Sequence, residues 1–203
     1  GLVGSEMCIR DRKEDIALSV ESHATSKITR LEDLDRLSTL GFRGEALPSI
    51  AACSRLEITS FSREAGTTAY SLLVEGGRRI ALTESKGNPG TTVDVAKLFF
   101  NMPARKKFLK SARAETSLAK SVFTEKATAF PAISFRLWID GKLSLFLPAC
   151  PPVARIRRLV KDADQEGFFE ESSYHGNTFS IDAVCGGPEV HARDRRLLQI
   201  YVN

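Results

Sequence analysis

Two glycine-containing dipeptides, Gly76-Gly77 and Asp140-Gly141, constrain the fold of this chain more than any other feature. Each lies between two segments with the pattern of β-strands, namely 69–75 and 78–83, and 134–139 and 142–147. A two-residue loop containing glycine favours a tight antiparallel hairpin. Residues 55–61 alternate apolar and polar side chains, and residues 91–95 are β-prone, so two more strands are predicted. The sequence therefore predicts sheets built from hairpins.

Apolar residues at helical spacing predict helices elsewhere in the chain. The expected helices cover 13–22, a short segment around Leu31–Leu37 with Thr29 as its cap, a helix from Glu45, 114–129 ended by Pro131, and 153–161. Further strands are expected over 178–184 and 197–202. Because helices and strands do not alternate, a doubly wound parallel fold is disfavoured. We predict a two-layer α/β sandwich with a largely antiparallel or mixed sheet.

Composition sets limits on the class of protein. The chain has 203 residues, of which 42% are hydrophobic and 27% charged, with a net charge of +4. This balance is that of a globular protein, and it permits a polyanionic partner without requiring one. No run of eighteen apolar residues is present, so no membrane span is predicted. The cysteines are scattered and are interpreted as reduced thiols: Cys8, Cys53, Cys150 and Cys185.

The segment from Leu40 to Leu47 combines two glycines, a cation and the start of a helix. Gly41 and Gly44 can take backbone angles closed to other residues and allow a ligand to approach the main chain. The helix that follows would direct its first N–H groups and positive dipole end towards an anion. Pro48 is tolerated because it falls in the first turn. The segment therefore predicts a phosphate loop, with a tight turn before a core helix as the alternative.

Two other segments have groups suited to phosphate binding. Thr25-Ser26-Lys27 combines hydroxyl groups with a lysine, and Gly90-Thr91-Thr92 forms a glycine–threonine turn at the start of a strand. Each also has a simpler interpretation. The two β-branched threonines suit a strand without any ligand, and Lys27 could be a solvated surface charge.

A basic segment follows the predicted strands. Between Asn101 and Lys120 six residues are basic and one, Glu115, is acidic. The six are Arg105, Lys106, Lys107, Lys110, Arg113 and Lys120. Such a stripe could neutralise a nucleic-acid backbone, although a solvated helix face remains an equal alternative. Nearby Phe99, Phe100 and Phe108 are expected in the core.

The sequence shows no other pattern of reactive residues. His23, His175 and His191 have no second ligand-type residue at helical spacing, so no metal site is predicted. No Ser-His-Asp or Cys-His arrangement and no acid/base pair of carboxylates stands out. We therefore assign no catalytic residue within this chain.

Four blocks, taken together and in order, resemble the MutL family of DNA mismatch repair proteins. They are HATSKI at 23–28, GFRGEALPSIA at 41–51, GTTV at 90–93 and LFFNMPARKKFL at 98–109. The resemblance implies a GHKL (Bergerat-type) ATPase sandwich followed by the start of a domain like ribosomal S5 domain 2. It also implies ATP and Mg²⁺ as ligands of the parent protein, an ATP hydrolase.

The resemblance also implies roles for individual residues. Thr25, Ser26 and Lys27 would belong to a lid over the nucleotide. The expected phosphate cradle and its neighbours are Gly41, Phe42, Arg43, Gly44 and Glu45, while Thr91 would lie near the adenine. Contact with DNA is our hypothesis from charge alone, for Arg105, Lys106, Lys107 and Lys110.

The same comparison predicts the organisation and setting of the chain. Residues 1–12 do not fit the family pattern and are expected to be a non-native leader. The ATPase domain would cover 13–150, and the S5-like domain would begin at 151, within the proline run formed by Pro148, Pro151 and Pro152. The helix with the catalytic glutamate and the Mg²⁺-binding asparagine, and the adenine-binding loop, have no counterparts, so this fragment is expected to be inactive.

The parent protein is expected in the bacterial cytoplasm, where it would couple a MutS-type mismatch recognition protein to strand cleavage on DNA. It would act there as a homodimer and would have no membrane partner. Two alternatives remain open. One is a non-enzymatic basic module for DNA binding or assembly, and the other is a different GHKL ATPase such as gyrase B.

Overall fold

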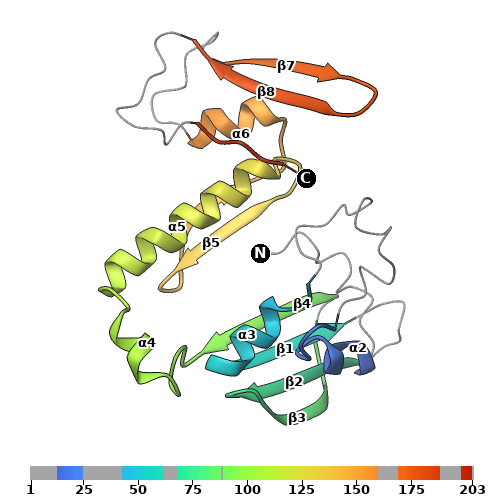
Figure 1. Cartoon of the computed structure of the whole chain (residues 1–203), viewed down its shortest axis with the longest axis vertical. Helices are drawn as coiled ribbons and strands as arrows, with labels where there is room; N and C mark the ends of the chain where they lie inside the picture. The colour runs from blue at the N-terminus through green and yellow to red at the C-terminus, as the bar shows by residue number, and fades with distance from the viewer. Residues whose placement is uncertain are drawn as a thin grey trace. The chain divides into compact units, whose positions relative to one another are not determined.

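The computed structural model describes residues 13–24, 43–61, 68–87, 89–159, 169–187 and 198–202. The chain divides into two compact units, one ending at Leu109 and one running from Lys110 to Val202. Figure 1 shows the elements of both units and labels most of them. The short helix predicted around Leu31–Leu37 lies outside the described residues.

The first unit is built on a four-stranded antiparallel sheet. Its strands are β1 (Arg55–Phe61), β2 (Ala69–Glu75), β3 (Arg78–Ser85) and β4 (Gly90–Ala96). The strand order is β3-β2-β1-β4, and every pairing is antiparallel. Gly76 and Gly77 both have positive φ, at 57° and 82°. Two successive positive φ values are what a two-residue hairpin turn requires, so the predicted β2–β3 hairpin is confirmed.

In the described part of this unit, two helices pack on the sheet. They are α2 (Lys13–Leu18), which contacts β2, and α3 (Ala46–Cys53), which contacts β1 and β2. The buried cluster consists of Ile16, Ala51, Leu56, Ile58, Leu72 and Val74. Leu56 and Leu72 are paired with Val74 and Ile58 across β1 and β2. Burying a side chain of this size stabilises the fold by about 1.5–3 kcal/mol, so the helix-covered face carries the stability of the unit.

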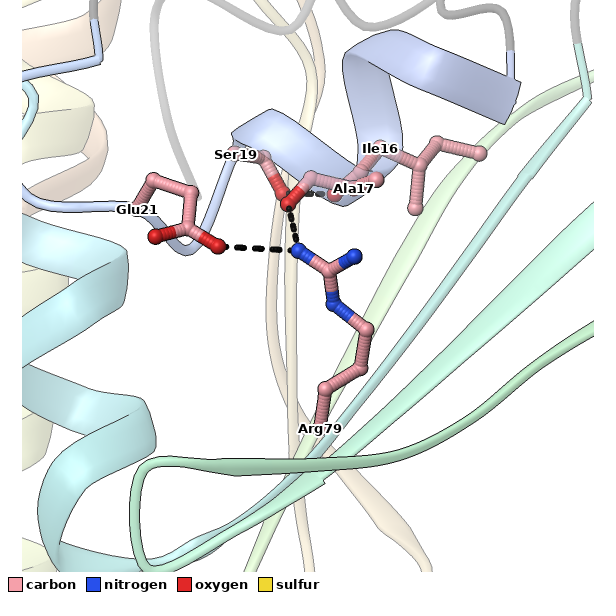
Figure 2. A network of polar contacts seen from close by, with 5 residues as sticks. All are labelled: Ile16, Ala17, Ser19, Glu21 and Arg79. Carbon is pink, nitrogen blue, oxygen red and sulfur yellow. Dashed lines mark hydrogen bonds and ion pairs between the residues drawn. The ribbon is translucent and has the colours of Figure 1, made fainter.

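Helix α2 ends earlier than its apolar spacing predicts. The Ser19 hydroxyl donates a hydrogen bond to the carbonyl oxygen of Ile16 at 2.7 Å, and the chain turns there. Arg79 on β3 reaches the same turn, donating to the carbonyl oxygen of Ala17 at 3.1 Å and to Glu21 Oε1 at 2.9 Å (Figure 2). This cation binds a carbonyl at the negative end of the helix dipole. Arg79 therefore links β3 to the end of α2 and to the turn that follows it.

Among its described residues, the second unit combines two helices with two separate hairpins. Its elements are α5 (Ala112–Ala129), β5 (Phe135–Ile139), β6 (Lys142–Leu147), α6 (Pro152–Leu159), β7 (Phe169–His175) and β8 (Ser180–Gly186). The predicted Asp140-Gly141 turn is confirmed, with φ values of 51° and 74°. Helix α5 contacts both β5 and α6. An edge-to-face contact of Phe123 with Phe135, 5.8 Å between ring centroids, joins α5 to β5.

One strand prediction in this unit was wrong, and one strand was missed. Residues 198–202 form no strand, and Tyr201 instead donates from its hydroxyl to the carbonyl oxygen of Glu125 on α5 at 2.9 Å. Strand β7 was not predicted, because all of its residues after Phe169 are exposed and most are polar. It forms by antiparallel pairing with β8. In both cases a partner for the backbone, rather than side-chain pattern, decides whether a strand exists.

The proline run at 148–152 lies inside the second unit. Arg155 on α6 is fully buried and donates to four main-chain carbonyl oxygens that surround it. The acceptors are Ala127 at 2.7 Å, Pro131 at 3.0 Å, Ile133 at 2.9 Å and Pro148 at 2.8 Å. Arg155 thus joins α6 to the end of α5 and to the β5–β6 hairpin. The domain boundary predicted at residue 151 stays a prediction.

Candidate functional site

The site begins with helix α3, whose C-terminal end is held by donors from outside the helix. The last carbonyl groups of a helix have no partner within it. Here the carbonyl oxygens of Ala51, Ala52, Cys53 and Ser54 accept from Gly77 N–H, Asn101 Nδ2, Phe99 N–H and Gly76 N–H. These four bonds measure 2.9, 2.9, 2.7 and 3.0 Å, respectively. They fix the direction in which the opposite, N-terminal end of α3 points.

At that N-terminal end, Gly44 adopts a conformation that excludes other residues. Its φ is +63°, in the left-handed region. A Cβ built on Gly44 would overlap the carbonyl oxygen of Ala24 and approach its carbonyl carbon to 2.8 Å. The main chain at Ala24 therefore packs directly against the turn before α3. The glycine is required twice, once by its backbone angle and once by this close approach.

Glu45 precedes α3 but does not cap it with its side chain. Its Oε1 instead accepts a hydrogen bond from the backbone N–H of His23 at 3.0 Å and lies 2.8 Å from His23 Nδ1. The ordinary role of an acidic residue at this position would be to bond the first N–H groups of the helix. With the carboxylate engaged by His23, the α3 amides are not neutralised by Glu45. Pro48, in the first turn, has no N–H to satisfy, as predicted.

Thr91 lies at the start of β4, opposite Ser60 of β1. The hydroxyl oxygens of the two residues are 2.9 Å apart, and Ser60 is buried. Thr91 also borders a hollow of about 390 Å³, which is otherwise lined by Thr59, Ser85, Lys86, Gly87, Pro89, Gly90 and Thr92. The predicted adenine-proximal threonine thus combines a hydrogen-bonded hydroxyl with an open space beside it.

The predicted DNA-contacting cations all lie on the surface. Arg105, Lys106 and Lys107 belong to α4 (Pro103–Lys107), and Lys110 follows it. Within the described part of the chain no ion pair joins any of these four to a carboxylate. The expectation that the neighbouring phenylalanines are core residues was wrong for two of them. Phe108 is 85% exposed and Phe100 40% exposed.

Five of the sequence-predicted nucleotide contacts lie outside the described residues, namely Thr25, Ser26, Lys27, Gly41 and Phe42. Of the others, the structure brings Arg43, Gly44 and Glu45 together at the start of α3. Arg43 is exposed there. All the site assignments therefore stay predictions, with their local geometry now defined at four positions.

Sequence reasoning missed three residues that shape this site. The sequence places His23 in the HATSKI block but assigns it no contact, whereas the structure pairs it with Glu45. Asn101 and Phe99 were counted with the basic segment and the core, whereas both donate to the end of α3. Phe99 also has a φ of 60°, an uncommon value for a residue with a side chain. No local sequence signal pairs these residues with partners more than twenty positions away.

Comparison with known proteins identifies the family. The chain is 39% identical over 191 residues to DNA mismatch repair protein MutL of Heliobacterium modesticaldum, covering 94% of this chain and 29% of that protein. It is 48% identical over 190 residues to MutL of Desulforudis audaxviator, covering 93% and 33%. The chain belongs to the MutL family. No protein-family model matches it, and it spans about a third or less of the length of these MutL relatives.

Solved structures agree with this assignment. The ATPase domain of Aquifex aeolicus MutL, complexed with ADP, matches with a TM-score of 0.56 and 26% identity, over 72% of this chain and 56% of that domain. The N-terminal domain of another DNA repair protein matches with a TM-score of 0.56 and 27% identity, over 79% and 47%. The predicted α/β fold of a GHKL ATPase is therefore confirmed for this MutL-family chain. No helix among its described residues is long and apolar enough to cross a membrane.

Proposed function

We propose that the chain is the nucleotide-binding part of a MutL-type mismatch repair protein, and that the start of α3 holds the phosphate groups of ATP. The observation that carries this proposal is the likeness to a MutL ATPase domain complexed with ADP. The geometry of the described residues supports it. The turn at Gly44 is possible only for glycine, and α3 is held at its far end by four outside donors.

The N-terminal end of a helix is suited to binding a phosphate group. The first amide groups of α3 and its positive dipole end favour an anion, and Glu45 does not cap them. Arg43 lies beside the same turn and can add a charge-assisted bond to a phosphate oxygen. We place Thr91 near the adenine, as the family resemblance implies. The segment with Thr25, Ser26 and Lys27 would complete the site.

The parent protein would hydrolyse ATP with Mg²⁺, which would neutralise charge on the phosphates. By the family resemblance, we expect no counterpart in these 203 residues of the glutamate and asparagine that would serve as general base and Mg²⁺ ligand. We therefore propose that the 203-residue chain binds nucleotide weakly and does not turn it over by itself. No residue described in the structure is assigned a catalytic role.

We also propose a wider role for the parent protein, based on the family. ATP binding would couple recognition of a mismatch by a MutS-type protein to cleavage of a DNA strand, with the parent protein acting as a cytoplasmic homodimer. The exposed cations of α4 would contact the phosphate backbone of DNA, because they have no carboxylate partners among the described residues.

The proposal is tested by titrating the full chain with ATP and measuring the heat of binding by calorimetry. We expect measurable ATP binding that is lost in Gly44→Ala, because the added methyl group would overlap the Ala24 main chain. Gly141→Ala is the matched control. Its φ is +74°, but a Cβ there meets nothing within 4 Å, and it lies in the β5–β6 turn. Equal ATP affinity in the wild type and Gly44→Ala would refute the phosphate site. A folded wild-type chain without any affinity for ATP would favour the non-enzymatic alternative.

A further inference from the structure

We infer that Glu45 is a positioning residue for the nucleotide site and not a ligand of the nucleotide or its metal ion. The inference rests on the proposed function, since it assigns a task to one residue of the proposed phosphate cradle. It changes the expectation from sequence, in which Glu45 was counted among the ATP contacts.

The carboxylate of Glu45 is engaged by one residue through two different groups. Oε1 accepts from the backbone N–H of His23 at 3.0 Å and lies 2.8 Å from its imidazole Nδ1. A backbone donor restrains the path of the main chain, whereas a side-chain donor alone would restrain only a rotamer. Glu45 therefore holds the chain at His23 against the start of α3, 22 positions later in the sequence.

A second, independent contact acts at the same place. The main chain of Ala24 packs so closely on Gly44 that no Cβ could be accommodated between them. His23 has a φ of 64°, a left-handed value that is uncommon for a residue with a side chain. Such a conformation persists where the surroundings impose it. The two contacts together join the chain at His23 and Ala24 to the turn at Gly44 and Glu45.

Upstream of His23, the same stretch of chain is tied to the sheet. Arg79 on β3 binds Ala17 at the end of α2 and Glu21 just before His23. The stretch is thus held at two points, one on β3 and one on α3. Glu45 completes this arrangement while directing its own negative charge towards His23. A free carboxylate at the start of α3 would compete with a phosphate for the same amides.

The chemistry of the substitutions separates positioning from ligation. Glu45→Ala removes the acceptor, so the site must order itself on binding, and we expect ATP affinity of the full chain to fall about tenfold. Glu45→Gln keeps a carbonyl oxygen that can accept the His23 N–H bond, and we expect it to retain affinity within about threefold of wild type. The loss of ATP affinity in Glu45→Ala should be the same in the presence of Mg²⁺ and in the presence of a chelator.

A double-mutant cycle adds a test that does not depend on the metal. His23→Ala removes only the imidazole, so its loss should be smaller than that of Glu45→Ala. The double variant should bind ATP no more weakly than Glu45→Ala alone, because both changes disrupt the same contact. Glu75→Ala is the matched control. Its side chain is 37% exposed against 41% for Glu45, and it also pairs with a cation, Lys97 at 3.8 Å.

The possible outcomes distinguish the inference from the function beneath it. If Glu45→Gln binds as weakly as Glu45→Ala, or if the loss appears only with Mg²⁺, Glu45 is a ligand and the inference is wrong. Additive losses of ATP affinity in the double-mutant cycle would also overturn the inference about Glu45. Wild-type affinity in all of the variants would do the same. Neither result would contradict the ATP site itself. A wild-type chain without affinity for ATP would instead overturn the proposed function.

Discussion

Replacing Arg155 with methionine should destabilise the second unit by about 3 kcal/mol. Arg155 is fully buried, and each of its four hydrogen-bond acceptors is a main-chain carbonyl oxygen. Its guanidinium also lies 5.6 Å from the ring centre of Phe135. Methionine fills much of the same volume without offering a donor. The substitution therefore tests the polar contacts more than the packing.

The magnitude follows from the acceptors that the change leaves without this donor. Pro131 keeps a second donor, because Cys150 N–H binds the same carbonyl oxygen at 2.9 Å. The carbonyls of Ala127, Ile133 and Pro148 lose the guanidinium. At about 1 kcal/mol for each of these three hydrogen bonds lost, the loss is about 3 kcal/mol. The substitution also removes the free-energy cost of burying a charged group, and this gain keeps the net loss of stability near about 3 kcal/mol.

The assay is urea unfolding followed by the fluorescence of Trp138. This is the only tryptophan in the chain, and it lies on β5 within the same unit. We expect the unfolding midpoint of Arg155→Met to fall while the dependence on urea is unchanged. The unfolding midpoint of Arg155→Lys should lie between those of the wild type and Arg155→Met, because one ammonium group cannot reach acceptors on three separate segments.

Arg158→Met is the control, since Arg158 is exposed on the same helix α6. An exposed substitution of this kind should change the free energy of unfolding by less than about 0.5 kcal/mol. The reasoning would be refuted if Arg155→Met also stayed within that range, or if Arg158→Met cost as much. Either result would mean that the four carbonyl contacts do not hold α6 in place.

Three other predictions concern the first unit, the end of the chain and the basic segment. Asn101→Asp should lower the unfolding free energy of the first unit by about 1–2 kcal/mol, measured by circular dichroism in urea, because a carboxylate cannot donate to the end of α3; an unchanged midpoint would contradict this. Burial, with a smaller contribution from the charge of a neighbouring glutamate, raises the pKa of the Tyr201 phenol, so the folded state favours its neutral form. The stability that the neutral Tyr201 phenol contributes is present below the ordinary tyrosine pKa and is lost as pH rises through the raised pKa. The difference in phenolate absorbance between wild type and Tyr201→Phe should therefore appear at higher pH than for free tyrosine. A difference that appears at the pH of free tyrosine would contradict the raised pKa. Neutralising three cations together should flatten the salt dependence of DNA binding by a slope of about 2–3, and an unchanged slope would exclude Arg105, Lys106 and Lys107 as phosphate contacts.

Features set by neighbouring residues were predictable. The Gly76-Gly77 and Asp140-Gly141 turns formed where the sequence places them, because positive φ values are a property of those few residues. The start of α3 after Gly44 followed from the same kind of local signal. These predictions needed no knowledge of what the rest of the chain does.

Features that depend on a distant partner were not predictable. Asn101 lies 49 positions from the carbonyl it binds on α3, and His23 lies 22 positions from Glu45. Residues 198–202 have the pattern of a strand but form none, whereas the polar β7 is a strand because β8 pairs with it. Apolar character also failed as a guide to burial at Phe108, which follows a helix too short to form a buried face.

The sequence by itself thus determined the hairpins, the glycine turn before α3 and the motifs of the MutL family, since each depends on the conformational limits of a few adjacent residues. Only the tertiary structure decided that Glu45 binds His23, that Asn101 anchors the end of α3 and that Arg155 is buried among carbonyls. Those contacts join segments far apart in the chain. Their formation depends on hydrogen bonds that become possible only when the sheet and helices have brought the partners together.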